Sequence, residues 1–137
     1  MKYLTTFLLL VSFLLVTSNF AQDSAQVKKR VTNEMIEESL LVGAKSGNEG
    51  LSISSAYYLG ETKSEAAVIP LMAMLKNSNS SEQAKVMAAL SLFKIGDERG
   101  IFAIKQSIEF EQNETVKKMC KIFYEMHLQA KKVEAKN

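Results

Sequence analysis

The sequence has few of the residue types that build disulfides, metal sites and catalytic centres. Its 137 residues include no tryptophan, one proline, one cysteine and one histidine. Because Cys120 has no second cysteine to pair with, no internal disulfide can form, and its apolar neighbours predict a buried, unreactive thiol. His127 has no cysteine or carboxylate motif beside it, so we expect an edge contact rather than a metal ligand or a triad member.

An excess of charge of one sign is also lacking. The 17 lysine and arginine residues nearly balance the 15 aspartate and glutamate residues, which is not the basic footprint of a nucleic-acid-binding protein. The one basic cluster, residues 28–30, is interpreted as the solvated start of a helix. Glu37 and Glu38 are adjacent, and adjacent helical residues point about 100° apart, so these carboxylates do not converge on a substrate. We predict no catalytic residue, no cofactor and no metal.

The first residues have the pattern of a secretory signal peptide. Lys2 precedes an apolar run from Leu4 to Val16, and the small residue Ala21 follows; this order is typical of a cleaved signal. We predict cleavage after residue 21, which leaves one domain over residues 22–137, free of the membrane, in the periplasm or outside the cell. The alternative is an uncleaved anchor, because the apolar run approaches the roughly 20 residues that span a bilayer.

The rest of the chain predicts an all-α protein. No segment alternates apolar and polar residues as strands do, whereas apolar residues recur at helical spacing. The predicted helices cover residues 26–46, 49–59, 65–77, 82–95 and 98–110, and a last helix opens at Gln112-Asn113. The residues predicted to face inward are Val68, Leu71, Met72 and Leu75; Val86, Ala89, Leu90 and Phe93; Ile101, Ile104 and Ile108; and Val116, Met119, Cys120, Phe123 and Ala130.

Glycines and capping residues bound the predicted helices. Gly60 and Gly96 each follow an apolar helix end, and we expect both to adopt the left-handed conformation that glycine takes without a side-chain penalty. Hydroxyl and carboxylate oxygens can accept hydrogen bonds from the free N–H groups at a helix start. The N-caps predicted on this basis are Ser64, Ser80 and Asp97.

Two segments nearly repeat each other. Residues 56–75 and 92–108 each contain an apolar helix end, a glycine, a short polar turn and a second apolar helix. A helix pair that recurs at a fixed period is typical of stacked helical arrays, whose units bury their apolar faces only against neighbours. We interpret the chain as six helices in three antiparallel pairs, the first pair degenerate.

The second of these segments resembles a known family. Leu-x-x-Ile-Gly-Asp-Glu-Arg-Gly-Ile-Phe-Ala-Ile at residues 92–104 is similar to the short bacterial HEAT-like repeat of the PBS-lyase type, in which glycine, aspartate and arginine form the turn before an apolar second helix. Glu-Ala-Ala-Val-Ile-Pro-Leu-Met at residues 65–72 resembles that second helix, with Pro70 where many repeats have proline.

The resemblance is good over residues 49–126 and weak over residues 26–48. Thr62 and Lys63 stand where the aspartate and arginine of the repeat would be, so the first turn departs from the family pattern. The resemblance implies a short right-handed α-solenoid that binds other macromolecules. It implies no reaction, because the family has many unrelated partners.

The helix predicted over residues 65–77 carries more apolar residues than one buried stripe needs. One interpretation is a central helix that is buried on most sides. The other is an exposed patch on the second-helix surface, where solenoids usually bind. The protein-binding residues predicted from the second interpretation are Ile69, Ala73, Met74, Lys76, Phe102, Lys105 and Glu109.

These observations predict an exported, non-catalytic adaptor or scaffold that binds another protein. Two alternatives stay open. One is an accessory subunit or lyase-like helper of an exported enzyme or chromophore protein, because some HEAT-like proteins handle chromophores. The other is a structural or stress-related protein that self-associates through its end repeats, because a short array leaves two end faces to cover.

Overall fold

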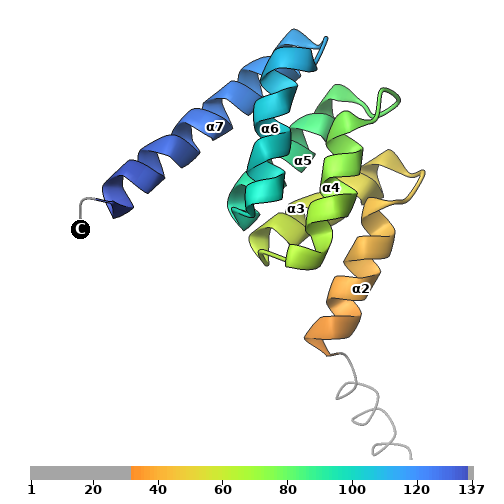
Figure 1. The fold of residues 1–137 in the computed structure, drawn as a ribbon. Helices are drawn as coiled ribbons and strands as arrows, with labels where there is room; N and C mark the ends of the chain where they lie inside the picture. Colours follow the sequence, from red (N-terminus) through yellow and green to blue (C-terminus); the bar gives the residue numbers. More distant parts are fainter. Residues whose placement is uncertain (1–31, 136–137) are drawn as a thin grey trace, which may run out of the picture. The chain divides into compact units, whose positions relative to one another are not determined.

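Every regular element of the described residues is helical. The computed structural model describes residues 32–135 (Figure 1). The elements are α2 (Asn33–Ala44), α3 (Glu49–Glu61), the 3-10 turn η1 (Glu65–Ala67), α4 (Val68–Lys76), α5 (Glu82–Ile95), α6 (Glu98–Phe110) and α7 (Glu114–Glu134). The predicted all-α class is therefore confirmed. None of the described helices combines the length and the apolar character that crossing a membrane requires.

Two predictions fall partly or wholly outside residues 32–135. The predicted signal peptide, residues 1–21, lies outside the described residues. The start of the helix predicted over residues 26–46 also lies outside the described residues. Within them, Thr32 is not helical and α2 begins at Asn33. The chain divides into two units, residues 1–36 and 37–137, and the helical array described below belongs to the second.

The array has two layers of helices. In one layer α3 packs on α5 and α5 packs on α7; in the other α4 packs on α6 (Figure 1). Each second helix also packs on the first helix of the next pair, so that α4 contacts α5 and α6 contacts α7. This is the arrangement of a short solenoid, in which α3 with α4 and α5 with α6 are successive pairs and α7 begins the next.

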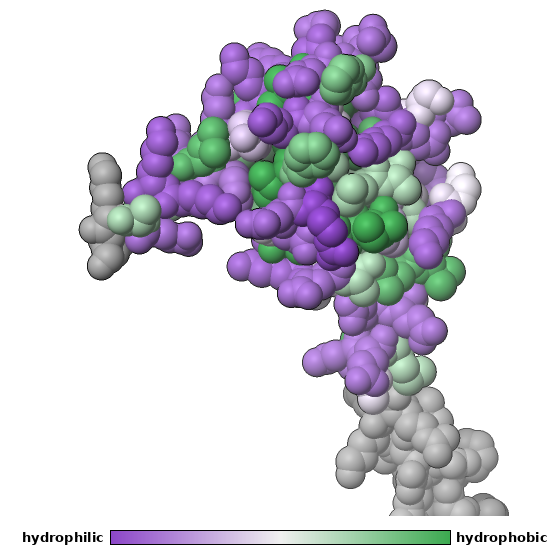
Figure 2. All heavy atoms as spheres, in the orientation of Figure 1, coloured by the Kyte–Doolittle hydropathy of each residue, from purple (hydrophilic) through white to green (hydrophobic). Residues whose placement is uncertain are grey.

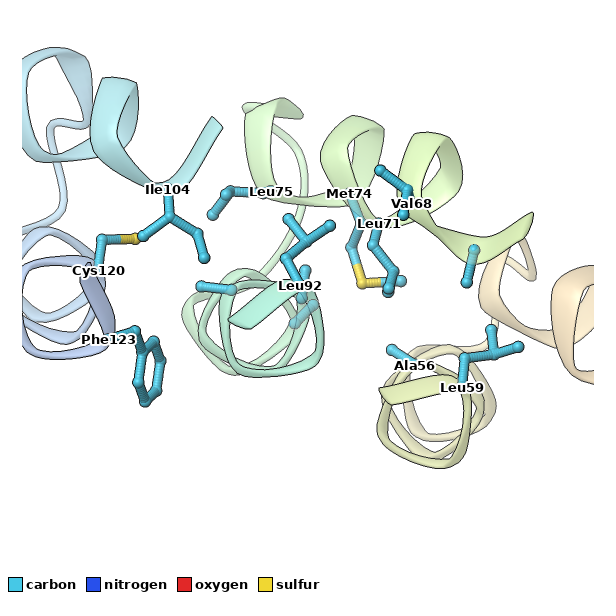
Figure 3. Packing of buried hydrophobic residues seen from close by; sticks show 14 of the residues in the cluster. Ala56, Leu59, Val68, Leu71, Met74, Leu75, Leu92, Ile104, Cys120 and Phe123 are labelled. Atoms are coloured by element: carbon cyan, nitrogen blue, oxygen red, sulfur yellow. The ribbon is translucent and has the colours of Figure 1, made fainter. Parts of the chain in front are cut away.

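The hydrophobic core is centred on α5, which packs against α3, α4, α6 and α7. Leu92 of α5 is fully buried, as are Leu59, Leu71 and Ile104 of the surrounding helices. Figure 3 shows side chains from these helices gathered in one cluster, which extends to Cys120 and Phe123 of α7. Most predicted inward residues are confirmed as fully buried or nearly so: Val68, Leu71, Leu75, Ala89, Ile101, Ile104, Val116, Cys120 and Phe123.

The predicted phase of α5 was partly wrong. Its buried face is built from the small residues Ala84 and Ala88 together with Leu92, whereas Val86 and Phe93 are only half-buried. Small side chains face inward because α5 has neighbours on several sides and they approach it closely. Phe93 lies toward α7, where its ring stacks on Phe123 with centroids 5.7 Å apart.

The far end of α7 was also predicted incorrectly. Ala130 is exposed, not inward-facing. The reason is length: α7 has 21 residues and its neighbour α6 has 13, so the last turns of α7 extend past the helix that would cover them.

Capping explains where the helices begin. Asp97 accepts a hydrogen bond from the Arg99 N–H at 2.9 Å, which confirms its predicted N-cap role. Asn113 caps α7 in the same way through the Val116 N–H. The cap of α5 is Ser81, which accepts from the Ala84 N–H at 3.2 Å; the predicted cap, Ser80, was one residue too early.

The start of α4 differs from the prediction. The segment opens with η1 and becomes α-helical at Val68, so Pro70 occupies the first α-helical turn, where a missing N–H costs little. Ser64 makes no capping hydrogen bond. Its hydroxyl instead donates to the Glu37 carboxylate, a partner 27 residues earlier that local pattern reasoning cannot supply.

The two turn glycines have different roles. Gly96 ends α5 with φ of 76°, as predicted. Gly60 was predicted wrongly: it lies inside α3, and the left-handed residue after that helix is Lys63, with φ of 51°. Hydrogen bonds from the Lys63 N–H to Gly60 O and from the Ser64 N–H to Leu59 O close this helix end.

Gly60 permits the close approach of α3 and α5. A Cβ atom at this position would lie 2.8 Å from the Ser91 Cα. At the same crossing the Ser91 hydroxyl donates to the Ala56 carbonyl at 2.8 Å. The helices α3 and α5, which lie in the same layer, are therefore joined by a close contact at Gly60 and by a buried side-chain hydrogen bond.

Candidate functional site

Six of the seven predicted binding residues are exposed, three on α4 and three on α6. On α4, Ile69, Ala73 and Lys76 are spaced at i, i+4 and i+7 and are all exposed, so they lie on one side of the helix. On α6, Phe102, Lys105 and Glu109 have the spacing i, i+3 and i+7 and are exposed as well. We call these six residues the α4–α6 face.

Two large apolar side chains dominate the α4–α6 face. Ile69 is 58% exposed and Phe102 is 57% exposed. Because α4 and α6 pack side by side, the two residues stand on neighbouring helices of one layer. Figure 2 shows hydrophobic atoms on the side of the molecule over α4 and α6, within a surface that is otherwise mostly hydrophilic.

Met74 does not belong to this face, contrary to the prediction. Its side chain is only 8% exposed, and Figure 3 shows it within the core cluster beside Leu71. Residue 74 follows Leu71 by three positions and precedes Leu75, so it shares their inward stripe. The two interpretations of this helix therefore each hold in part: Met74 is core, and Ile69 and Ala73 are surface.

The structure adds residues that sequence reasoning missed. The Lys76 ammonium donates to the Gln106 carboxamide at 3.2 Å and links α4 to α6 across the face. A cavity of about 290 Å³ lies beside this link, and Leu75, Ser107 and the exposed Phe110 help to line it. Gln106 follows Phe102 by four residues, so helical spacing alone could have placed both residues on one side of α6. Nothing in the sequence singled out Gln106, because a lone glutamine belongs to no recognisable motif.

A second hollow lies between α6 and α7. Its volume is about 280 Å³. The lining residues are Glu98, Ile101, Phe102, Lys105, Tyr124, His127, Leu128 and Lys131; we call this the α6–α7 groove. Its α7 side was not predicted from the sequence. His127, for which an edge contact was expected, is half-buried and is one of the lining residues. Because Phe102 and Lys105 line it, the groove is continuous with the α4–α6 face.

Charged groups near these surfaces are mainly structural. The Arg99 guanidinium donates to both carboxylate oxygens of Asp97 at 2.9 Å, and this holds the pKa of Asp97 below its usual value. Between α3 and α5, Lys94 pairs with Glu61, and the Lys94 ammonium lies 5.1 Å from the centre of the Tyr57 ring.

The Cys120 thiol is buried, as predicted. Its side chain has no exposed surface, and burial, with a smaller contribution from Glu111, raises the pKa of the thiol to about 11. Such a thiol is protonated and unreactive at neutral pH. Within residues 32–135, no cluster of histidine, cysteine, aspartate and glutamate side chains could hold a metal ion.

Comparison with known proteins supports the fold. No family model matches the sequence, and no curated protein matches it. The structure is similar to that of human deoxyhypusine hydroxylase in complex with glycerol, with a TM-score of 0.63 and 22% sequence identity; the likeness covers 68% of this chain and 32% of that one. The chain thus spans about a third of that enzyme's length. At this identity the likeness shows a shared helical-repeat fold and nothing about activity.

Proposed function

We propose that the protein is an exported, non-catalytic module of the HEAT-like type that binds another protein on its α4–α6 face. The observation that carries the proposal is the exposure of two large apolar side chains, Ile69 on α4 and Phe102 on α6, on helices that pack on each other in one layer. Soluble proteins seldom expose large apolar side chains together without a use for them. The exposed charged residues Lys76, Lys105 and Glu109 lie on the same sides of these helices, and protein interfaces commonly have a polar rim around an apolar centre.

The architecture supports the same proposal. Ile69 and Phe102 stand on the second helices of successive pairs, and stacked repeats create extended surfaces of this kind. The apolar contacts would provide affinity, and the charged residues around them would select the partner and its orientation. Recognition of this kind needs no cofactor.

The experiment is a crosslinking pull-down from the exported fraction of the source cells. Wild type is compared with Ile69→Asp/Phe102→Asp, in which both apolar side chains become charged. The matched control is Tyr58→Asp, because Tyr58 is 56% exposed on the first-layer helix α3. We expect the double variant to stay helical and lose the partner, while the control keeps it. Retained capture by a folded double variant would exclude this face.

Export is part of the proposal and has its own test. It is supported by the order of Lys2, the apolar run over residues 4–16 and Ala21. N-terminal sequencing of the protein from the cell envelope or medium should begin at Gln22. An intact N-terminus in a membrane pellet would instead support an uncleaved anchor, and recovery from the cytoplasm alone would contradict export.

Self-association is a second candidate, favoured by one observation on α7. Ile122, Met126 and Val133 are exposed and lie on one side of this helix, which is the last of the array within the described residues. Covering an end helix with a second copy would bury that stripe. Sedimentation velocity tests this: a dimer that Ile122→Glu/Met126→Glu converts to monomer would support it, and a wild-type monomer at all concentrations would exclude it.

A further inference from the structure

The α6–α7 groove has an apolar base and cationic rims. Ile101 and Phe102 come from α6, and Tyr124 and Leu128 come from α7. Ile101 is buried, so it belongs to the base of the groove, whereas Phe102 and Leu128 are exposed and available for contact. A groove of this form between two helices suits an amphipathic segment that inserts apolar side chains from one face.

The charges around the groove favour an acidic ligand. Lys105 is exposed and has no ion-pair partner among residues 32–135. Lys131 pairs only loosely with Glu98, at 3.9 Å, and both side chains are more than half exposed. Glu98 is the one acidic residue of the lining, so two ammonium groups face one carboxylate.

The length of the groove sets the size of the ligand. Its α6 side runs from Glu98 to Lys105, about 10 Å at 1.5 Å per helical residue. The neighbouring helices α6 and α7 are joined by a three-residue connection, residues 111–113, and therefore run antiparallel. This places Lys131, beside Glu98, at one end and Lys105 at the other. A ligand helix would make contact over about two turns.

We propose that the α6–α7 groove binds an acidic, amphipathic helical segment of a partner protein. Leucine-like side chains of the segment enter between Phe102 and Leu128, and its carboxylates meet Lys105 and Lys131. This inference deepens the proposed binding function and rests on it, because Phe102 and Lys105 belong to both surfaces. It adds the chemistry of the partner, which the α4–α6 face alone does not specify.

The probe is a fluorescent amphipathic peptide of about 14 residues, long enough for four helical turns, with leucine on one face and glutamate on the other. Its counterpart carries lysine in place of glutamate. Fluorescence anisotropy with the purified protein should show binding of the acidic peptide only. Binding should weaken as salt is raised, because exposed charges are screened. Equal or tighter binding of the basic peptide, or no binding of the acidic one, would overturn the proposal.

Two variants locate the site. Lys105→Glu/Lys131→Glu should weaken binding of the acidic peptide by about tenfold or more, since like charges then face each other. The control Lys45→Glu/Lys118→Glu changes the net charge equally at two exposed residues outside the groove and should leave binding unchanged. If both double variants weaken binding equally, the attraction is not local and the groove is not the site.

A third pair of variants separates this inference from the proposed function. Leu128→Asp changes the groove alone, and Ile69→Asp changes the α4–α6 face alone. Leu128→Asp should abolish peptide binding, and Ile69→Asp should leave it intact while reducing capture of the natural partner. Peptide binding that survives Leu128→Asp would refute the groove, even if Ile69→Asp shows the face to be a binding surface.

Discussion

The Lys85 ammonium lies 2.8 Å from the Glu111 carboxylate, and each side chain is only 11% exposed. Lys85 is in α5, and Glu111 is in the connection between α6 and α7. The other carboxylate oxygen of Glu111 accepts from the Gln112 and Asn113 N–H groups at 2.9 and 3.0 Å. One carboxylate therefore joins α5 to the connection that positions α7.

Removing one member of this pair should destabilise the fold. Lys85→Met leaves the Glu111 charge largely buried without its partner, and we expect a loss of about 2–3 kcal/mol in the free energy of unfolding. Glu111→Gln keeps an acceptor for the two backbone N–H groups but removes the charge. A double-mutant cycle from urea denaturation measures the coupling. Purely additive losses would mean that the pair contributes nothing as a pair.

The same carboxylate should make stability depend on acid pH. Burial acts to raise the pKa of Glu111, but the Lys85 ammonium and the backbone N–H donors outweigh burial and hold it below its ordinary value of 4.5. A carboxyl whose pKa is lowered by folding stabilises the native state above the unfolded pKa and loses that contribution as the pH falls. Wild type should therefore lose more stability below about pH 4.5 than Glu111→Gln does. Parallel pH profiles of the two proteins would contradict this.

The two glycines should respond differently to alanine. Gly60→Ala improves helix propensity but drives a Cβ against the Ser91 Cα, a backbone atom that cannot move aside cheaply, so we expect a loss of about 2 kcal/mol. The Cβ atom added by Gly96→Ala would meet no atom within 4 Å, but the residue has a positive φ, so we expect a loss of about 1 kcal/mol in the free energy of unfolding. The control is Gly47→Ala, where no atom lies within 4 Å of the added Cβ. A stabilised Gly60→Ala variant would show that α3 and α5 do not approach so closely.

The Cys120 thiol should be inert in the folded protein. A thiol reagent should label it only after denaturant is added, whereas a cysteine at the exposed position Ser54, in a Cys120→Ala background, should react at once. Rapid labelling of native Cys120 would refute its burial.

The Cys120 thiol should also make stability depend on alkaline pH. Folding raises the pKa of the Cys120 thiol from 9.0 to about 11, so its contribution to stability is present below pH 9 and is lost as the pH rises toward 11.

Much of the fold could be predicted because its determinants are local. Apolar residues at helical spacing located α3 to α7, and Asp97 could be recognised as a cap because the N–H donor that it accepts from, that of Arg99, lies only two residues away. Gly60 could not be assigned correctly in this way. In sequence it resembles Gly96, and only Ser91, 31 positions later, distinguishes a glycine of close approach from a glycine of a turn.

The candidate site was predictable to a similar extent. Ile69 follows from the excess of apolar residues in its helix over what one stripe can bury, and Phe102 follows from its place on the second helix of the next repeat. Met74 was misplaced because the spacing of apolar residues in a short helix does not fix which of two neighbouring side chains points inward. The α6–α7 groove could not be predicted, since it depends on Leu128 and Lys131 lying across from residues near Phe102. The Lys85–Glu111 pair could not be predicted either, because its two residues are 26 positions apart and local patterns do not connect them.

Site-specific photo-crosslinking in cells that produce the protein shows directly whether the α4–α6 face binds another protein. A photoreactive side chain is placed in turn at Ile69, Phe102 and, as a control of matched exposure, Tyr58. We expect the Ile69 and Phe102 positions to crosslink to one and the same protein and the Tyr58 position not to. Crosslinks from Tyr58 to that protein with none from Ile69 and Phe102 would contradict this expectation.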